Sequence, residues 1–478
     1  MYGLDRLVAG LLAPLAMWVL ASGLDDLFLD LYAIYRWLVE RRRRSGVEDC
    51  DGGPAAEKSI ALLIPAWRED RVIERMLDHN IAAIDYASYE IFVGVYPNDL
   101  RTQSRVQACE EKCARVHRVV CPHDGPTSKA DCLNWLYRGV LRYEEEQGRR
   151  FDVFLHHDAE DLIHPRSLAW IHRYTEQYDM VQIPVLPLET PWQELTHGTY
   201  CDEFAEAHLR NLHLRQRLGG FLPSSGVGTA YRRRALERLA WNNRGRLFEP
   251  ASLTEDYRAG LELHRIGCTQ ILLDARRLGE RGKPAATREY FPRDFRGAVR
   301  QKARWIAGIT LQSWQDIGWN AGRGQWYWLW RDRKGLIGNP LTILANLVFL
   351  YGLARWGWAE ASGEPWQVAQ LVSAWTPLWW LLVINSGLIV TRQLARAWCV
   401  WEVYGWRHAA ICPLRALWGN LINFAATARA IGLFVGAQLR REAAPWLKTE
   451  HVYPGLAQLS HFGGGSGQNP DLSGNKPY

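Results

Sequence analysis

The sequence predicts an α/β fold inserted between membrane-spanning helices, and three observations support this class. Short β-branched runs alternate with helix-period segments from about residue 59 to residue 273. Long apolar runs precede and follow this region, and clusters of basic residues flank them. Because alternating strands and helices form βαβ units, we expect a mostly parallel sheet that binds its ligands at the carboxyl ends of the strands.

Most of the predicted strands are short runs bounded by Pro, Asp or Gly, and most are separated by segments of helical period. The strands are Ile60–Ile64, Glu90–Val95, Val116–Val120, Asp152–Leu155, Val181–Val185 and Thr269–Leu273. The helices are Asp70–Ile84, Arg101–Cys113, Ser128–Gln147, Arg166–Gln177 and Asp256–Arg265.

The first apolar run, Leu7–Leu20, continues as an amphipathic segment to Glu40 and is followed by four arginines, Arg41 to Arg44. A cleaved signal peptide would carry its basic residues before the apolar run. We therefore predict a retained anchor at residues 1–45 with its N-terminus outside, because basic flanks stay in the cytoplasm.

Two further spans are predicted at Leu336–Leu353 and Val368–Val390, each about 20 residues long as a bilayer requires. Arg331, Arg333 and Lys334 precede them, which places that flank inside. Leu414–Gln438 mixes Trp, Asn and Arg with apolar residues, so we expect an interfacial helix rather than a fourth span. The predicted divisions are a cytoplasmic domain at 57–310, an interfacial segment at 311–335, two membrane helices at 336–397, interfacial or amphipathic helices at 398–450 and a disordered tail at 451–478.

The composition agrees with a polar domain that carries a few lipid-facing helices. Hydrophobic residues make up 48% of the 478 residues, yet the mean hydropathy is −0.24, which argues against a polytopic transporter. The net charge of +6 is modest, so no nucleic-acid partner is expected. Nine scattered cysteines contain no Cys-x-x-Cys pair and fit a reducing cytosol.

Candidate ligand-binding residues follow the ends of the first two strands. The first strand runs into Pro65, Trp67 and Glu69, where ordinary turn chemistry is the alternative. Asp99 follows the second strand, and its carboxylate could accept the imide hydrogen of uracil or cap the next helix. Lys129 opens a predicted helix, where a cation and the helix amide end favour phosphate, although a surface lysine would look the same.

Two carboxylates, Asp158 and Glu160, come directly after the strand Asp152–Leu155. Hard oxygen ligands at positions i and i+2 could hold Mg²⁺ or Mn²⁺ against the two phosphates of a sugar nucleotide. The preceding His156 and His157 leave zinc as a lesser alternative.

The remaining candidates lie downstream. Glu255 and Asp256 begin a predicted helix, where a carboxylate could take a proton from a sugar hydroxyl, or Thr254 or Asp256 could serve as a cap. Gly226 and Gly228 belong to a small, glycine-rich stretch that lets backbone approach a sugar closely and lacks the Gly-Lys-Ser/Thr ending of a phosphate loop.

Gln301, Arg304 and Trp305 form a Gln-x-x-Arg-Trp motif. Its planar cation could neutralise a departing diphosphate, and its indole offers an apolar face to an acceptor sugar. Interfacial anchoring near a membrane is the alternative.

Taken in order, these motifs resemble the membrane-embedded glycosyltransferases of family 2, which include cellulose, chitin and hyaluronan synthases, over about Ser59 to Trp305. The resemblance implies a GT-A (nucleotide-diphospho-sugar transferase) fold. It also implies roles for the named residues: Pro65, Trp67, Glu69, Asp99, Lys129, Asp158 and Arg304 bind the nucleotide sugar, Asp158 and Glu160 hold the metal, Asp256 with Glu255 provides the base, and Gly226, Gly228, Gln301 and Trp305 meet the acceptor. The family pattern is usually Asp-x-Asp, and Glu160 departs from it.

Several stretches are similar to the bacteriophage adsorption protein B subfamily, among them Tyr96–Asp99, Asp158–Asp161, Ser252–Tyr257, Arg288–Pro292, Trp330–Gly335 and Trp418–Phe424. Members are inner-membrane transferases implicated in making a surface exopolysaccharide that phage use as a receptor. Many carry a C-terminal domain that binds cyclic di-GMP, which we do not expect in this sequence, so such control would need a partner chain or another mechanism.

The resemblance implies an inverting, metal-dependent transferase of the bacterial inner membrane, with a cytoplasmic catalytic domain. It would move a sugar, most simply from a UDP-N-acetylhexosamine, to a growing exopolysaccharide, with an export or outer-membrane protein as a further partner. The alternatives are a single-addition enzyme that glycosylates a lipid-linked acceptor and a non-catalytic receptor or scaffold. The carboxylates at every candidate site disfavour the scaffold.

Overall fold

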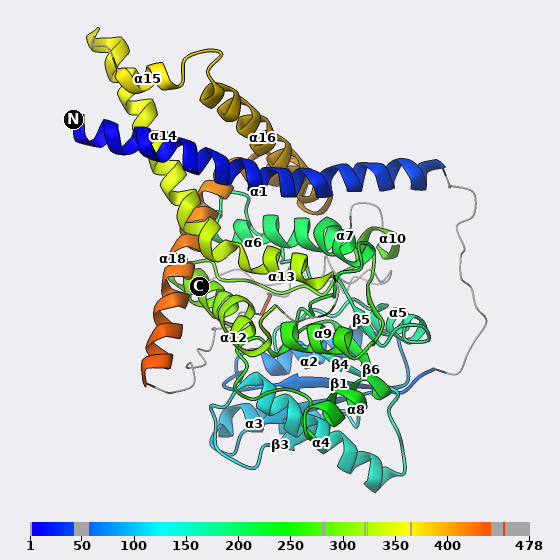
Figure 1. The fold of residues 1–478 in the computed structure, drawn as a ribbon. Coiled ribbons are helices and arrows are strands. Elements are labelled where there is room, and N and C mark those ends of the chain that lie inside the picture. Colours follow the sequence, from blue (N-terminus) through cyan, green and yellow to red (C-terminus); the bar gives the residue numbers. More distant parts are fainter. Residues whose placement is uncertain are drawn as a thin grey trace, which may run out of the picture.

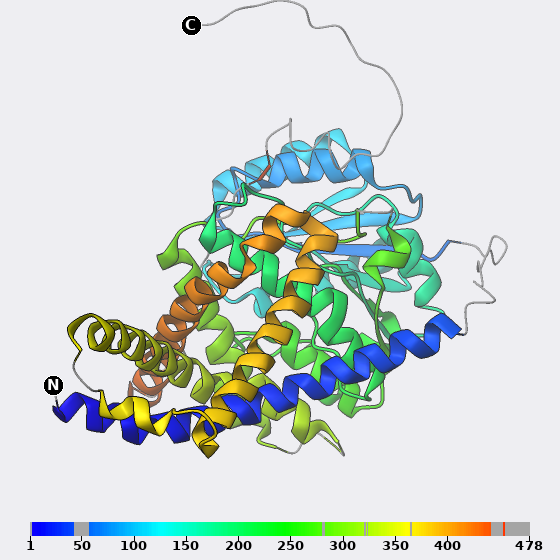
Figure 2. The ribbon, with the colours of Figure 1, turned by 90° about the horizontal axis from the view of Figure 1, so that it is seen from above.

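The computed structural model describes residues 2–42, 57–279, 283–319, 322, 324–363, 366–440 and 453–454. A mixed sheet with helices on both faces forms one part of the molecule, and long helices lie along one side of it (Figure 1). Viewed from above, α1 (Tyr2–Arg42) and α16 (Pro377–Tyr404) cross on that side (Figure 2).

The sheet has seven strands within the described ranges, in the order β3-β2-β1-β4-β6-β5-β7. Its parallel part consists of β1, β2, β3 and β4, with Ile60 of β1 opposite Tyr89 of β2 and Val153 of β4. β6 runs antiparallel to both β4 and β5, and β5 pairs in parallel with β7. The strands are β1 Ile60–Pro65, β2 Tyr89–Val95, β3 Val116–Val120, β4 Val153–His156, β5 Met180–Gln182, β6 Thr229–Arg232 and β7 Gln270–Leu272.

The six strands predicted from the sequence all occur, within one or two residues at most ends. β5 is shorter than expected because the chain leaves the sheet after Gln182, and Val185 makes an isolated bridge to Thr287 instead. β6 was not predicted. Its four residues follow a glycine-rich stretch and give too short a pattern to distinguish a strand from a loop.

Alternate residues of each central strand face two different layers of helices. On one face Ile60, Leu62 and Ile64 pack with side chains of α2 and α5. On the other, Ala61 and Leu63 pack with side chains of α4, α8 and α9. The helices of this part are α2 Ile73–Ala83, α3 Leu100–Lys112, α4 Lys129–Gln147, α5 Ser167–Tyr174, α6 Leu195–Glu206, η1 Ala207–Asn211, α7 Leu212–Arg217, α8 Arg233–Asn242, α9 Glu255–Arg265, α10 Ala275–Leu278, α11 Phe295–Ile306, η2 Ala307–Gln312 and α12 Ser313–Ile317.

Among the residues that the structure describes, four helices are long and apolar enough to cross a membrane, judged by length and composition alone. They lie at Gly3–Arg36, Gly335–Ser362, Pro377–Tyr404 and Cys412–Arg440. The first two contain the predicted spans Leu7–Leu20 and Leu336–Leu353. The third begins at Pro377, nine residues after the predicted start at Val368, because the short helix α15 and a turn occupy the residues before it. The fourth, α18 (Cys412–Arg440), is the segment that we expect to be interfacial. It packs against α6, α11 and α14 (Gly335–Ser362). The shorter helices of this part are α13 Gln325–Arg333, α15 Gln367–Leu371 and α17 Trp406–Ala410.

The proposed domain boundaries stay predictions. Arg43 and Arg44, and the predicted tail apart from Tyr453 and Pro454, lie outside the described residues.

Ion pairs attach α1 to α13 and to the residue that follows it. Asp25 accepts hydrogen bonds from Arg331, from Lys334 at 2.7 Å and from the Tyr327 hydroxyl at 2.7 Å. Asp26 accepts one from Arg331 at 2.9 Å. The acidic residues of the predicted amphipathic continuation therefore bind the basic flank of the second span.

Candidate active site

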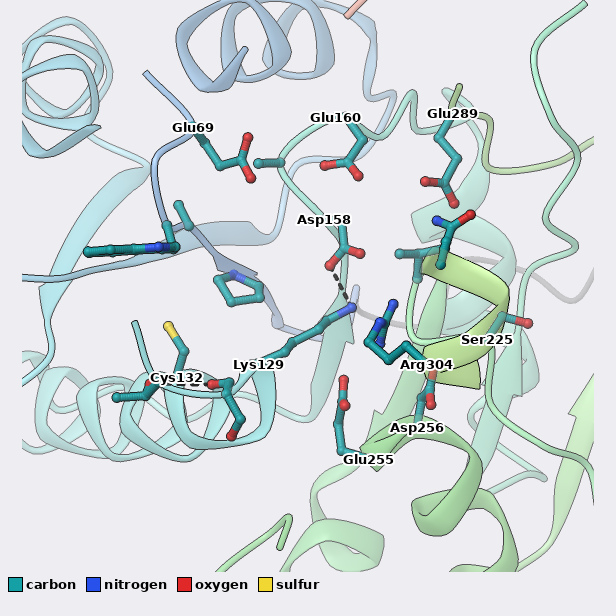
Figure 3. Close-up of a pocket in the computed structure, with 18 of the residues that line it drawn as sticks. Glu69, Lys129, Cys132, Asp158, Glu160, Ser225, Glu255, Asp256, Glu289 and Arg304 are labelled. Carbon is teal, nitrogen blue, oxygen red and sulfur yellow. Dashed lines mark hydrogen bonds and ion pairs between the residues drawn. The ribbon is translucent and has the colours of Figure 1, made fainter. Parts of the chain in front are cut away.

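A cavity opens at the carboxyl ends of β1 and β4, where the first residues of α4 and α9 and the side of α11 meet (Figure 3). This is the edge of the sheet at which the sequence predicts ligand binding. The lining residues are Pro65, Ala66, Trp67, Glu69, Tyr96, Thr127, Ser128, Lys129, Cys132, Asp158, Ala159, Glu160, Ser225, Val227, Glu255, Asp256, Glu289, Phe291, Gln301, Arg304 and Trp305.

The cavity brings together every predicted site residue except Asp99, Gly226 and Gly228. Segments as far apart in sequence as Pro65 and Trp305 contribute to it. The roles assigned to these residues stay predictions, but their convergence on one cavity is a property of the fold.

Lys129 occupies the middle of the cavity, between two groups of carboxylates (Figure 3). Its Nζ lies 2.5 Å from Asp158 Oδ1 and donates to the Gly226 carbonyl at 3.3 Å. Burial would lower the pKa of Lys129, but the negative charges of Asp158, Glu255 and Asp256 outweigh burial and raise it above its ordinary value. The side chain therefore stays a cation.

The turn that carries Asp158 is held from behind by Asp161. Asp161 Oδ2 accepts a hydrogen bond from the Asp158 backbone N–H at 2.9 Å and lies 2.7 Å from His157 Nδ1. Burial raises the pKa of Asp161 above its ordinary value. His156 packs against Tyr231 and Phe248, and burial lowers its pKa to about 3. Both histidines are buried, and neither lines the cavity.

Asp158 and Glu160 present carboxylates to one side of the cavity, with Glu160 buried and Asp158 side chain 27% exposed. The 2.5 Å contact with an ammonium group shows that Asp158 faces a position that suits a cation. No three His, Cys, Asp or Glu side chains converge on one point in the described parts of the chain. Two carboxylates on one side of the cavity, one of them already beside a cation, fit a divalent ion that takes its remaining ligands from outside the protein.

Glu255 and Asp256 form the first turn of α9 and face Lys129 across the cavity. Burial, followed by the neighbouring charge of Asp256, raises the pKa of Glu255 to about 7. Burial also raises the pKa of Asp256, although Lys129 and Arg304 oppose the shift. Thr254 makes no side-chain capping bond, so the alternative in which Thr254 caps α9 is not observed.

The glycine-rich stretch passes directly beside Asp256. Gly226 has φ 76°, and a Cβ there would lie 2.7 Å from Asp256 Oδ2. Gln182 fixes this stretch from the end of β5: its amide donates to Val227 O at 2.9 Å and accepts from Ser225 N–H at 2.9 Å. Only glycine combines this backbone conformation with such a close approach.

Gly228 and Asp99 do not line the cavity and instead stabilise segments that form its walls. A Cβ on Gly228 would meet Thr287 Oγ1 at 2.6 Å, and neither residue lines the cavity. Asp99 caps α3 through Thr102 N–H and accepts the Arg68 N–H at 2.5 Å. It therefore fixes the turn that presents Trp67 and Glu69, as in the capping alternative for this residue.

Gln301, Arg304 and Trp305 lie on α11. Arg304 donates to the Leu253 carbonyl at 3.1 Å, just before α9, and its charge reaches both Glu255 and Asp256. Trp305 packs edge-on against Tyr200 and Phe291, with ring centroids 6.0 and 6.3 Å apart. Gln301 Oε1 is buried with no hydrogen-bond partner among the described residues.

Sequence reasoning missed Glu289 and Phe291, which also line the cavity; Glu289 is labelled in Figure 3. They belong to an irregular segment held by isolated bridges, with Thr287 beside Val185 and Arg288 beside Leu162. The stretch Arg288–Pro292 carried a resemblance to known sequences, but no local pattern indicated that it reached the site.

The chain matches a family model described as glycosyltransferase like family 2 over residues 56–308. It is 38% identical over 463 residues to bacteriophage adsorption protein B of Escherichia coli K12 and to bacteriophage N4 adsorption protein B of Escherichia coli O157:H7. Each alignment covers 92% of this chain, which spans 62% of the length of those relatives.

Among solved structures, a mannosyltransferase from Pyrobaculum calidifontis in complex with GDP-Man and Mn²⁺ is similar at 15% identity and a TM-score of 0.49. That alignment covers 85% of this chain and 99% of the other. The family match covers the whole sheet and every residue of the cavity. The chain therefore belongs to glycosyltransferase family 2 and is a glycosyltransferase with a GT-A-like fold.

Proposed function

We propose that this protein is an inverting, divalent-metal-dependent transferase that adds sugar from a nucleotide donor to a growing exopolysaccharide. The observation that carries the proposal is the placement of Asp256 across one cavity from Lys129 and Asp158. Donor phosphates can thus lie beside the cation of Lys129, while an acceptor hydroxyl lies beside the proposed base, Asp256. A UDP-N-acetylhexosamine is the donor we favour, with the turn Pro65–Glu69 around its base.

In this proposal the acceptor hydroxyl oxygen forms a bond to the anomeric carbon while the bond from that carbon to the phosphate oxygen breaks. The hydroxyl proton passes to Asp256, and the electron pair leaves on the nucleoside diphosphate. Lys129 and Arg304 stabilise the charge that develops on the diphosphate. Glu255 is adjacent to Asp256, and its negative charge increases the affinity of these two carboxylates, taken together, for the proton.

Asp158 and Glu160 would hold Mg²⁺ or Mn²⁺, which when bound neutralises the donor phosphates. Trp305 and Gln301 would contact the acceptor, with the ring of Trp305 as its apolar face. The four span-capable helices support a membrane location, and we place the catalytic domain in the cytoplasm of a bacterial cell. A phage-receptor role for the product is proposed from the similarity to the adsorption proteins.

Replacing Asp256 by Asn tests the proposal. We expect sugar transfer to fall at least a thousandfold while UDP binding stays within threefold of the parent protein, because the amide keeps the shape of the side chain and removes the base. Transfer is measured with a panel of radiolabelled nucleotide sugars, and UDP binding by calorimetry in Mn²⁺.

The matched control is Asp316→Asn, which alters a carboxylate paired with Arg258 outside the cavity. It should transfer normally. Undiminished transfer by Asp256→Asn would remove Asp256 from the mechanism.

A further inference from the structure

A second cavity lies between the segment that follows β5 and the end of α16. It shares no lining residue with the active-site cavity, among the residues that the structure describes. It is lined by Leu188, Glu189, Thr190, Pro191, Trp192, Tyr290, Tyr404, Gly405, Trp406, Arg407 and His408.

The two cavities are separated by one extended segment of chain. Glu289 and Phe291 line the active site, whereas Tyr290 lines the second cavity. Successive side chains of an extended backbone point to opposite sides. The Leu188 N–H donates to the Glu289 carbonyl at 2.9 Å, so the segment is hydrogen-bonded into a wall between them.

Aromatic rings form much of the second cavity. Trp406 is 68% exposed and Trp192 is 38% exposed, and the two come from different parts of the chain. Tyr404 is buried and fixed by a 2.8 Å hydrogen bond from its hydroxyl to the Pro187 carbonyl. Rings with one free face and one packed face suit the apolar C–H faces of sugars.

The polar groups of the cavity are balanced in charge. Glu189 supplies one exposed carboxylate and Arg407 one guanidinium, which lies over the Trp406 ring at 5.6 Å. His408 is buried, and burial with the nearby charge of Arg415 lowers its pKa to about 4, so it is neutral at pH 7. The Thr190 hydroxyl lies 3.2 Å from His197 Nδ1, and His408 Nδ1 lies 3.3 Å from an Arg415 nitrogen, so these two side chains already have partners in the wall of the cavity.

This balance distinguishes between ligand classes. A phosphate or diphosphate headgroup is usually bound by several cations or by a helix amide end, and here its one guanidinium partner would be offset by Glu189. Sugar hydroxyls both donate and accept hydrogen bonds, and the exposed Glu189 carboxylate and the Arg407 guanidinium satisfy both needs.

We propose that the second cavity binds a neutral oligosaccharide segment of the glycan, at a distance from the end that reacts at Asp256. This inference rests on the proposed function, because it takes the acceptor to be a glycan of several sugars. Such a site would keep the product on the enzyme between additions and would increase the number of sugars added in each encounter.

A Trp-Arg pair that follows a candidate span could instead anchor the helix end at a membrane surface. That reading requires nothing of Glu189, Thr190 and Trp192, which belong to the catalytic part of the chain and complete the cavity. The two readings differ in what the loss of Trp192 does.

The test uses the full chain, purified in detergent and carrying Asp256→Asn so that it cannot turn over. Linear hexasaccharides of N-acetylglucosamine, of mannose and of glucose are titrated separately by calorimetry, with UDP affinity measured in the same samples. We expect at least one hexasaccharide to bind, and Trp406→Ala and Trp192→Ala each to weaken that binding at least tenfold. Trp406→Phe, which keeps a ring, should weaken it less than threefold.

Trp401→Ala is the matched control, because Trp401 is an exposed tryptophan at the same end of α16 that lines neither cavity. It should not change hexasaccharide affinity. If Trp406→Ala also loses UDP affinity, the end of α16 has misfolded in that variant. The hexasaccharide affinity of Trp192→Ala then decides whether the second cavity binds the glycan.

Absence of binding by all three hexasaccharides overturns the proposal. So does hexasaccharide binding that neither Trp406→Ala nor Trp192→Ala weakens. Failure of the proposed function is recognised separately, as hexasaccharide binding in a protein that, with Asp256 intact, transfers sugar from no nucleotide donor.

Discussion

Lys129 Nζ lies 2.5 Å from Asp158 Oδ1, and Lys129 stands between the carboxylates proposed for metal, Asp158 and Glu160, and those proposed for catalysis. Lys129 and Arg304 are the cationic side chains that line the cavity in the described part of the chain. In the proposed function, the phosphates of a donor would give Lys129 a new anionic partner, and Asp158 would then be available to a metal ion. The Lys129–Asp158 pair would thereby link donor binding to the charge beside Glu255 and Asp256.

Lys129→Met should weaken UDP binding in Mn²⁺ at least tenfold, which corresponds to about 1.4 kcal/mol. The methionine keeps much of the side-chain volume but removes the cation that we assign to the phosphates. Calorimetry with UDP measures the effect. Lys112→Met is the control, because Lys112 pairs with Glu74 on the surface of α3. Equal UDP affinities in the two variants would show that Lys129 does not contact the donor.

Gly226→Ala should reduce transfer at least tenfold, because the new Cβ would lie 2.7 Å from Asp256 Oδ2 and displace the carboxylate. The substitution also places alanine at φ 76°, which destabilises the fold by about 1 kcal/mol.

Gly245→Ala separates the two effects. Gly245 has φ 85° and nothing within 4 Å of a Cβ, so this variant should lose similar stability and keep its activity. Rates of transfer and melting temperatures are measured together. Equal losses of activity would mean that backbone strain, not the contact with Asp256, explains the effect.

The pKa of about 7 at Glu255 predicts a pH-dependent stability. Because the folded-state pKa lies above the ordinary value of 4.5, the folded protein holds this proton more tightly than the unfolded chain. The stabilisation is complete below about pH 4.5 and disappears as the pH rises through 7. Its full size is on the order of 3 kcal/mol, shared with Asp256 as a titrating pair.

Glu255→Gln removes this titration, so its melting temperature relative to the parent protein should be higher at pH 8 than at pH 5.5. Thermal melts in detergent at the two pH values measure the difference. Glu249→Gln alters an exposed neighbour and should show none. A difference of the opposite sign for Glu255→Gln would mean that the folded state favours the ionised carboxylate.

The sequence predicts the parallel half of the sheet well because those strands are regular and separated by helices of clear period. Strands β1 to β4 begin and end within one residue of the predicted positions. The antiparallel strand β6 is missed because a four-residue strand after glycines carries almost no periodic signal. Its pairing with β4 and β5 depends on contacts that are distant in sequence.

The residues of the candidate site are likewise predicted where the chain is regular and missed where it is irregular. Asp158, just after β4, and Lys129, at the start of α4, are found because topology alone brings strand ends and the helix starts that follow them to one edge. Glu289 is missed because its segment reaches the cavity through the isolated bridges of Thr287 and Arg288. Asp99 follows β2 as predicted, but its carboxylate accepts a hydrogen bond from the Arg68 N–H in the neighbouring turn and does not line the cavity.

The ion pairs of α1 also bear on how the chain is made. Arg331 is 306 residues after Asp25 in the sequence, so a ribosome synthesises the acidic groups of the first helix long before their partners. Until then, Asp25 and Asp26 must remain hydrated or be neutralised by other cations, because an isolated carboxylate is costly to bury. Helix α1 consequently completes these ion pairs only after α13 and α16 have been translated.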